Sequence, residues 1–231
     1  MKECENKEII ENSDKIAEEI LNTKSSNKYR DHFFPMMIDK LGLKTGSEIG
    51  VDKGGFSKNI LDRSNISKYY CIDTWQDDFG SDHRPDYFAK EGNVRFNQAR
   101  DTLQKYIDEE KVTMIKNTGL NASKYFGTES IDFCYIDGDH SLGGIYNDII
   151  AWVPKVKIGG LIGGHDYKDG PKSGISDYYY GQLDYKIETV VNYYGQRYGY
   201  KINSVGGRIK SWWFIKHKES EDILGDFLNE G

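Results

Sequence analysis

The residues best suited to chemistry form two short groups of acids and histidines. Asp137, Asp139 and His140 lie in the segment YIDGDH, and His165 and Asp166 end the segment GGLIGGHD. Each group follows an apolar run typical of a buried strand, where ionisable side chains are costly unless they are paired or bind a cation. Two carboxylates and an imidazole suit a divalent metal ion. The alternative is that these acids only cap the helices that follow.

A glycine-rich turn follows the first strand-like run. The segment EIGVDKGGFS contains Glu48, Gly50, Gly54, Gly55 and Ser57. Glycines let backbone N–H groups approach a ligand closely, and the helix that follows presents free N–H groups and a positive dipole end. The dinucleotide pattern G-x-G-x-x-G is not met, because Asp52 stands where its second glycine should be. The turn would therefore bind a pyrophosphate poorly. The alternative to a ligand-binding turn is a plain turn between strand and helix.

Two later strand ends carry candidate cofactor contacts. Asp73 ends the segment KYYCID, and an acid roughly 20 residues past a glycine turn can bind both hydroxyls of a ribose. A capping or turn aspartate is the alternative. Trp75 suits either closure over an adenine or packing in the core, and Thr118 is placed to contact a base edge.

The elements that must position these residues alternate between strands and helices from residue 47 onwards. Apolar residues at helical spacing predict two helices in the first forty residues, the second broken around Pro35. Strands are predicted at SEIGV, KYYCID, VTMIKN, IDFCYID, GGLIGGHD, YKINSVG and SWWFIKHK. Alternation with helices predicts a mainly parallel sheet covered on both faces. In such sheets ligands bind beyond the carboxyl ends of the strands, which is where the candidate residues lie.

Length and composition limit the classes of protein to which this chain can belong. The 231 residues fit one large domain, and 13% aromatic residues exclude a disordered chain. A net charge of −6 argues against a nucleic-acid partner. The apolar runs fall far short of the roughly 20 residues that span a bilayer, and the charged N-terminal segment does not resemble a signal peptide. We therefore expect a cytoplasmic protein without a membrane partner.

The three cysteines show no metal-binding spacing. Cys71 and Cys134 lie in apolar strand-like runs, whereas Cys4 lies in the charged N-terminal segment. Buried free thiols are predicted for the first two, which fits a reducing compartment.

From about Gly46 to Lys218 the chain resembles a class I S-adenosylmethionine-dependent methyltransferase. The resemblance is carried by EIGVDKGGFS, CIDTW and YIDGDHSLGGIYNDIIAWVPKVKIGGLIGGHDY. The last segment is similar to methyltransferases related to cephalosporin hydroxylase and to metal-dependent sugar O-methyltransferases. The resemblance implies an α/β fold with a doubly wound, mainly parallel seven-stranded sheet whose last strand is antiparallel. It places this domain at 46–231, behind an N-terminal helical extension at 1–45.

The resemblance also implies roles for single residues. It places the methionine part of the cofactor on the glycine turn, the ribose on Asp73 and the adenine near Thr118. Of these contacts the resemblance itself implies Gly50, Gly54, Gly55, Asp73 and Thr118. The full set of predicted cofactor contacts is Glu48, Gly50, Gly54, Gly55, Ser57, Asp73, Trp75, Thr118 and Asp137. The implied metal ligands are Asp137, His165 and Asp166; His165 replaces an acid, and imidazole prefers softer ions than Mg²⁺. The general base is His140, with Asp139 as the second candidate.

The predicted function is methyl transfer from S-adenosylmethionine to a hydroxyl of a small molecule or sugar, assisted by Mg²⁺ or another divalent cation. The alternatives are a nicotinamide-dependent oxidoreductase and a non-catalytic binding module. Segments 75–93 and 168–200 are predicted to cover the acceptor pocket. Tyrosines crowd the second segment and suit sugars or aromatic acceptors; a lid or the interface of a homo-oligomer is the other interpretation. These tyrosines are Tyr178, Tyr179, Tyr180, Tyr185, Tyr193, Tyr194, Tyr198 and Tyr200.

Overall fold

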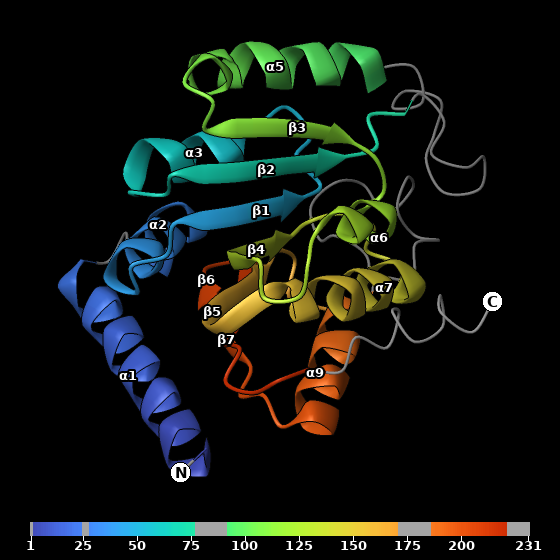
Figure 1. Ribbon diagram of the computed structural model, residues 1–231. Helices are drawn as coiled ribbons and strands as arrows, with labels where there is room; N and C mark the ends of the chain where they lie inside the picture. The colour runs from blue at the N-terminus through green and yellow to red at the C-terminus, as the bar shows by residue number, and fades with distance from the viewer. Residues whose placement is uncertain (1, 25–27, 77–91, 171–185, 221–231) are drawn as a thin grey trace.

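Seven strands form a single sheet at the centre of the computed structural model, which describes residues 2–24, 28–76, 92–170 and 186–220 (Figure 1). The strand order in this part of the chain is β3-β2-β1-β4-β5-β7-β6. The strands are β1 Thr45–Ile49, β2 Lys68–Asp73, β3 Val112–Lys116, β4 Ile131–Ile136, β5 Val156–Gly164, β6 Asn203–Gly206 and β7 Lys210–Ile215. All pairs from β3 to β5 are parallel, and β7 is antiparallel to both β5 and β6. The predicted mainly parallel sheet with its last strand antiparallel is confirmed.

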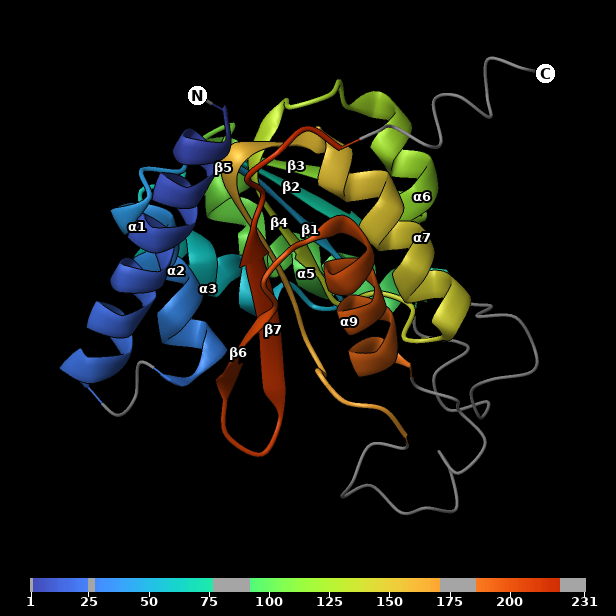
Figure 2. The ribbon, with the colours of Figure 1, turned by 90° about the horizontal axis from the view of Figure 1, so that it is seen from below.

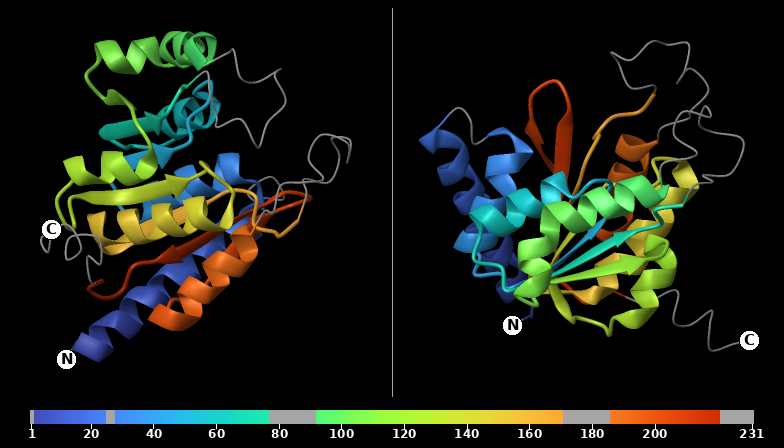
Figure 3. Two further views of the ribbon diagram at one scale, coloured as in Figure 1. Left: turned by 90° about the vertical axis from the view of Figure 1, so that its right-hand side faces the viewer. Right: turned by 90° about the horizontal axis from the view of Figure 1, so that it is seen from above.

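Helices cover both faces of the sheet, as Figures 2 and 3 show. One face carries α1 Lys2–Thr23, α2 Arg30–Lys40, α3 Gly55–Arg63 and α5 Gly92–Asp108. The other carries α6 Gly119–Ala122, α7 Leu142–Trp152 and α9 Ile187–Tyr198. Short 3₁₀ turns follow α6 at Ser123–Tyr125 and α7 at Val153–Lys155. Each face has its own apolar core, which explains why the central strands are apolar almost throughout.

The helix α2 is fixed on the sheet by aromatic packing. Phe34 meets Tyr135 of β4 edge to face at 5.0 Å between ring centroids, and Phe33 lies 5.5 Å from Trp213 of β7. Both phenylalanines are fully buried. This packing sets the start of α2, at Arg30, beside the carboxyl end of β4.

The predicted break of the second helix at Pro35 is wrong. Pro35 lies inside α2 and is buried. A proline leaves the carbonyl four residues earlier without its helical N–H donor, and this carbonyl belongs to Asp31. The side-chain amide of Asn59 on α3 donates to it at 2.7 Å. The helix therefore continues because a neighbouring element satisfies the group that proline leaves unpaired.

The structure describes residues 168–170 and 186–200 of the Tyr-rich segment. Residues 171–185, with Tyr178, Tyr179, Tyr180 and Tyr185, lie outside the described residues, as do 77–91 of the other predicted cover segment. Tyr194 and Tyr200 are buried and stack at 5.9 Å, whereas Tyr193 is 51% exposed. The described part of this segment thus packs α9 onto the sheet.

Two further observations bear on the cysteines and on membranes. Cys71 and Cys134 are buried free thiols, as predicted. Over the residues with an assigned structure, every helix is too short or too polar to cross a bilayer.

Candidate active site

The glycine turn joins β1 to α3 at the carboxyl edge of the sheet. Gly50 has φ +88°, and a Cβ there would lie 2.1 Å from the backbone oxygen of Asp137. Gly54 has φ +79° and is the N-cap of α3. Only glycine avoids strain or overlap at these two positions. The turn therefore runs directly against the end of β4, which carries the acid–histidine group.

Asp73 links the glycine turn to the end of β2. Its two carboxylate oxygens accept backbone N–H bonds from Asp52 and Trp75, each at 2.9 Å. Burial raises the pKa of Asp73, and the two backbone hydrogen bonds reduce that increase without cancelling it. Each oxygen keeps a further lone pair for a ribose hydroxyl. The ribose contact stays a prediction.

Two other contacts hold the same turn. Trp75 is 2% exposed; its indole N–H donates to the backbone oxygen of Asp52 at 2.9 Å, and its ring meets Phe96 edge to face. Arg95 of α5 forms an ion pair with the Asp52 carboxylate. Asp52 adopts φ +52°, and its side chain turns towards α5. Contact between Trp75 and an adenine stays a prediction, while its packing role is observed.

Glu48 lies beneath the turn, inside the core. Ser57 donates to its carboxylate at 2.5 Å, and the Tyr69 hydroxyl lies 3.5 Å away. Burial raises the pKa of Glu48 to about 8, although the Ser57 hydrogen bond opposes the increase. Glu48 and Ser57 therefore join β1 to the first turn of α3, and their predicted contact with the cofactor is untested.

Glu48→Gln is expected to change how stability depends on pH. The folded pKa of about 8 exceeds the ordinary value of 4.5. The stability that this raised pKa confers is complete below the ordinary value and is lost as pH rises towards 8. One pKa unit corresponds to about 1.4 kcal/mol, so the wild type should lose a few kcal/mol more than Glu48→Gln between pH 5 and 8.

Urea denaturation across this pH range measures the difference. The exposed Glu18 of α1 supplies the control, and Glu18→Gln should follow the wild-type curve. Parallel curves for Glu48→Gln and wild type would show that Glu48 is ionised in the fold at pH 5.

The end of β3 carries Thr118 as the N-cap of α6. Its hydroxyl accepts the Asn121 N–H at 3.2 Å. The indole N–H of Trp152 donates to the Gly119 carbonyl at 3.0 Å, which fixes this loop on α7.

Asp148, also on α7, is 6% exposed and lies against Gly119 and Gly138. Burial, with a smaller effect from Asp139, raises the pKa of Asp148 to about 7. The short helix α6 and Asp148 were not predicted from the sequence.

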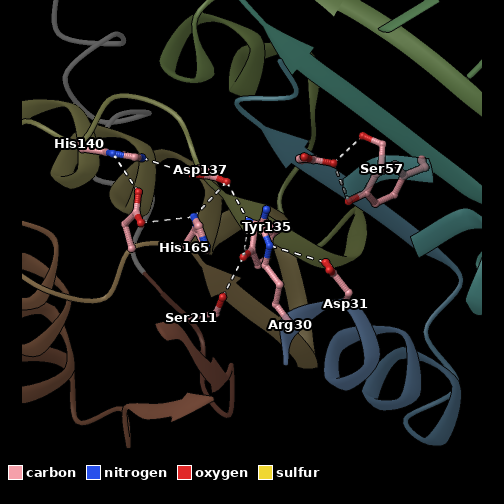
Figure 4. Close-up of polar contacts among 11 residues, drawn as sticks. Arg30, Asp31, Ser57, Tyr135, Asp137, His140, His165 and Ser211 are labelled. Carbon is pink, nitrogen blue, oxygen red and sulfur yellow. Dashed lines mark hydrogen bonds and ion pairs between the residues drawn. The ribbon is translucent and has the colours of Figure 1, made fainter. Parts of the chain in front are cut away.

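Four residues meet at the ends of β4 and β5, and we call them the strand-end cluster: Asp137, His140 and His165, labelled in Figure 4, and Asp166, which contacts both histidines. The two strands are parallel neighbours with Ile136 beside Gly164. His140 Nε2 lies 3.3 Å from Asp137 Oδ1, and His140 Nδ1 lies 3.5 Å from Asp166 Oδ2. His165 Nδ1 lies 3.6 Å from Asp137 and 3.5 Å from Asp166. The strands that end before Asp137 and Asp166 are thus neighbours, as the predicted meeting of the two carboxylates requires.

The electrostatics of the cluster favour an ionised Asp137. Burial alone would raise its pKa, but contacts with His140 and His165 outweigh burial and hold the pKa well below its usual range. Asp166 is 2% exposed and adopts φ +49°, a conformation that is uncommon for residues other than glycine. Asp139 lies apart: it is exposed and accepts the Ser141 N–H at 2.9 Å, at the start of α7.

A divalent cation fits the donor atoms of this cluster. One ligand atom each from Asp137, His140 and Asp166 lie within 4.8 Å of one another. His165 contacts both aspartates but is not one of these three residues, although the resemblance implied it as a ligand; His140 stands in its place. Two carboxylates with imidazoles suit first-row transition ions such as Mn²⁺ better than Mg²⁺. His140 is thus placed both to be a ligand and to be a base.

Sequence reasoning missed Arg30, which reaches the cluster from α2. Its guanidinium donates to Asp137 Oδ2 at 3.1 Å and to the Tyr135 hydroxyl at 3.4 Å. Tyr135 in turn pairs with Ser211 of β7 at 3.0 Å. Arg30 precedes Asp137 by 107 residues, and it stands in a polar segment between two helical patterns, so no local signal identifies it.

The comparisons with known proteins agree with this geometry. A family model described as a methyltransferase domain matches residues 47–167, more than half of the chain. No curated protein matches the sequence. The match favours the methyl-transfer interpretation over a nicotinamide oxidoreductase and over a non-catalytic module.

Three solved structures show the same fold at low sequence identity. A putative caffeoyl-CoA O-methyltransferase from Staphylococcus aureus is 16% identical, with 80% of this chain and 82% of that chain covered and a TM-score of 0.55. Cofactor-bound Rv0187 from MTB is 12% identical, with 85% and 82% covered and a TM-score of 0.55. An O-methyltransferase family protein from Burkholderia thailandensis is 12% identical, with 83% and 57% covered and a TM-score of 0.54.

The family match extends over the glycine turn, Asp73 and the strand-end cluster. The chain therefore belongs to the methyltransferase domain family and is a class I S-adenosylmethionine-dependent methyltransferase.

Proposed function

We propose that this enzyme methylates a hydroxyl of a small-molecule acceptor, a sugar or related polyol, and that the strand-end cluster activates the hydroxyl. The observation that carries the proposal is the contact between the glycine turn and the cluster. The Asp137 N–H donates to the Ile49 carbonyl at 2.7 Å, and Gly50 lies directly against the Asp137 backbone. A methyl donor on the turn and an acceptor oxygen at the cluster would thus be neighbours.

An alcohol is a weak nucleophile while it keeps its proton, so methyl transfer to it requires activation of the hydroxyl. The C–S bond of the sulfonium breaks, a C–O bond forms, and the sulfonium leaves as a neutral thioether. The hydroxyl proton must go to a base, and His140 is the base that we propose. Its ring lies between Asp137 and Asp166, so two carboxylates orient it and stabilise the imidazolium formed by proton transfer.

Asp137, His140 and Asp166 are the residues that would hold a divalent cation, with His165 beside them. When bound, such a cation acts as a Lewis acid that lowers the pKa of a hydroxyl. His140 serves as base or as ligand, and the two roles predict different effects of His140→Ala on Mn²⁺ affinity.

Two experiments test the proposal. Calorimetric titration with S-adenosylhomocysteine should give saturable binding, and its absence at high micromolar concentration would refute the cofactor site. A mass-spectrometric screen with S-adenosylmethionine should then detect a gain of one methyl group on sugars or polyols. Methylation confined to phenols or thiols would contradict the proposed acceptor class.

A further inference from the structure

Arg30 is the cation that the N-terminal helices bring to the strand-end cluster. It begins α2, outside the matched residues 47–167. Its guanidinium lies 4.9 Å from the centre of the Phe56 ring and 3.1 Å from Asp137 Oδ2. The side chain is 29% exposed. Arg30 is therefore held by packing as well as by charge.

Arg30 occupies one of the two oxygens of Asp137. Oδ2 accepts from Arg30 and also lies 3.6 Å from His165 Nδ1, whereas Oδ1 faces His140. A divalent ion held by Asp137 must share this carboxylate with a guanidinium, which carries a fixed positive charge at any ordinary pH. Like charges repel strongly in a partly buried site, where the effective dielectric constant is well below that of water.

We propose that Arg30 is the built-in counter-cation of the strand-end cluster: it balances Asp137 in the absence of a metal and lowers the affinity of the cluster for a divalent cation. This role rests on the proposed function, since it concerns the cation that the same cluster would hold. Through Arg30, the N-terminal helices influence the affinity of the cluster for a divalent cation.

Mn²⁺ is the probe, because its ligand preferences fit carboxylate and imidazole and because electron paramagnetic resonance distinguishes free from bound ion. Arg30→Met removes the charge and keeps an unbranched stem for Phe56, and Arg30→Gln removes the charge and keeps hydrogen-bond donors. Both variants should bind Mn²⁺ about tenfold more tightly, or better, than the wild type. Arg30→Lys keeps the charge and should stay within about threefold of the wild type.

Arg63→Met is the matched control. Arg63 is exposed on α3, and its guanidinium contacts His32, outside the cluster. Its removal changes net charge by the same amount and should leave Mn²⁺ affinity unchanged at 0.15 M salt, where exposed charges are screened beyond about 8 Å.

The outcomes separate clearly. Unchanged or weaker Mn²⁺ binding in both Arg30→Met and Arg30→Gln would overturn the role of Arg30, as would no binding by any variant. Titration of the same samples with S-adenosylhomocysteine reports folding and the cofactor site independently. If the wild type does not bind S-adenosylhomocysteine, the result contradicts the proposed function and leaves the role of Arg30 to the Mn²⁺ titrations.

Discussion

His140→Ala is expected to slow methyl transfer by about 10²–10⁴-fold while S-adenosylhomocysteine binds with unchanged affinity. The imidazole lies at the end of β4 between two carboxylates, at 3.3 Å from Asp137 and 3.5 Å from Asp166. Its loss leaves the acceptor proton without a positioned base, whereas the glycine turn and Asp73 are untouched. Single-turnover rates with an acceptor from the screen measure the effect on the chemical step.

His32→Ala is the control for this prediction. His32 lies on α2 and contacts Arg63 at 3.3 Å, outside the strand-end cluster, so its removal should leave the rate unchanged.

Asp137→Asn should abolish turnover with cofactor binding retained. Asparagine is preferable to alanine here, because it keeps an oxygen for the partly buried Arg30.

Metal dependence separates the two roles of His140. An excess of chelator should abolish turnover; full activity in chelator would remove the metal from the mechanism and leave proximity and the base. As a base, His140 should leave Mn²⁺ affinity nearly unchanged when it is replaced by alanine. A parallel loss of rate and Mn²⁺ affinity would identify it as a ligand instead.

The strand-end cluster could be predicted from the sequence because the topology of the sheet determines where the residues at the strand ends lie. Asp137 and Asp166 each follow an apolar strand, and parallel neighbours bring their carboxyl ends to one edge. The same reasoning located the glycine turn and Asp73. Local pattern is sufficient wherever a residue stands immediately after a strand whose neighbour is known.

Arg30 and Glu48 show where this reasoning ends. Arg30 reaches the cluster only because Phe33 and Phe34 fix α2 on the sheet, a contact between elements that no local pattern encodes. Glu48 lies inside β1, one residue before its end, and its side chain faces the core and Ser57. The two-residue alternation of a strand tells which residues share a face, but the packed helices decide which face is open.

Pro35 and Asp139 illustrate a second limit. Pro35 stays in a helix because Asn59 satisfies the carbonyl of Asp31, and that partner lies on another helix. Asp139 belongs to the same tetrapeptide as Asp137 and His140 but turns to the backbone of Ser141. Neighbouring positions in a turn point in different directions, so the tetrapeptide predicts a site without telling which of its acids takes part.

Asp73→Ala is expected to weaken S-adenosylhomocysteine binding by roughly 10- to 150-fold. A carboxylate that binds two ribose hydroxyls makes charge-assisted hydrogen bonds worth about 1.5–3 kcal/mol, and about 1.4 kcal/mol corresponds to a tenfold change in affinity. The same carboxylate accepts the N–H groups of Asp52 and Trp75. The substitution therefore also removes two contacts that shape the turn, and calorimetry must be paired with a melting curve of the free protein.

Asp139 offers a matched control for the structural part of this effect. Asp73 accepts the N–H of Trp75 two residues ahead at 2.9 Å, and Asp139 accepts that of Ser141 two residues ahead at the same distance. Asp139→Ala thus removes a turn hydrogen bond equivalent to one of the two that Asp73 accepts. It should lower the melting temperature slightly with cofactor affinity retained. If Asp73→Ala loses no more affinity than Asp139→Ala, Asp73 is a turn residue and the ribose is bound elsewhere. If it loses affinity with little change in melting temperature, the carboxylate binds the ribose directly.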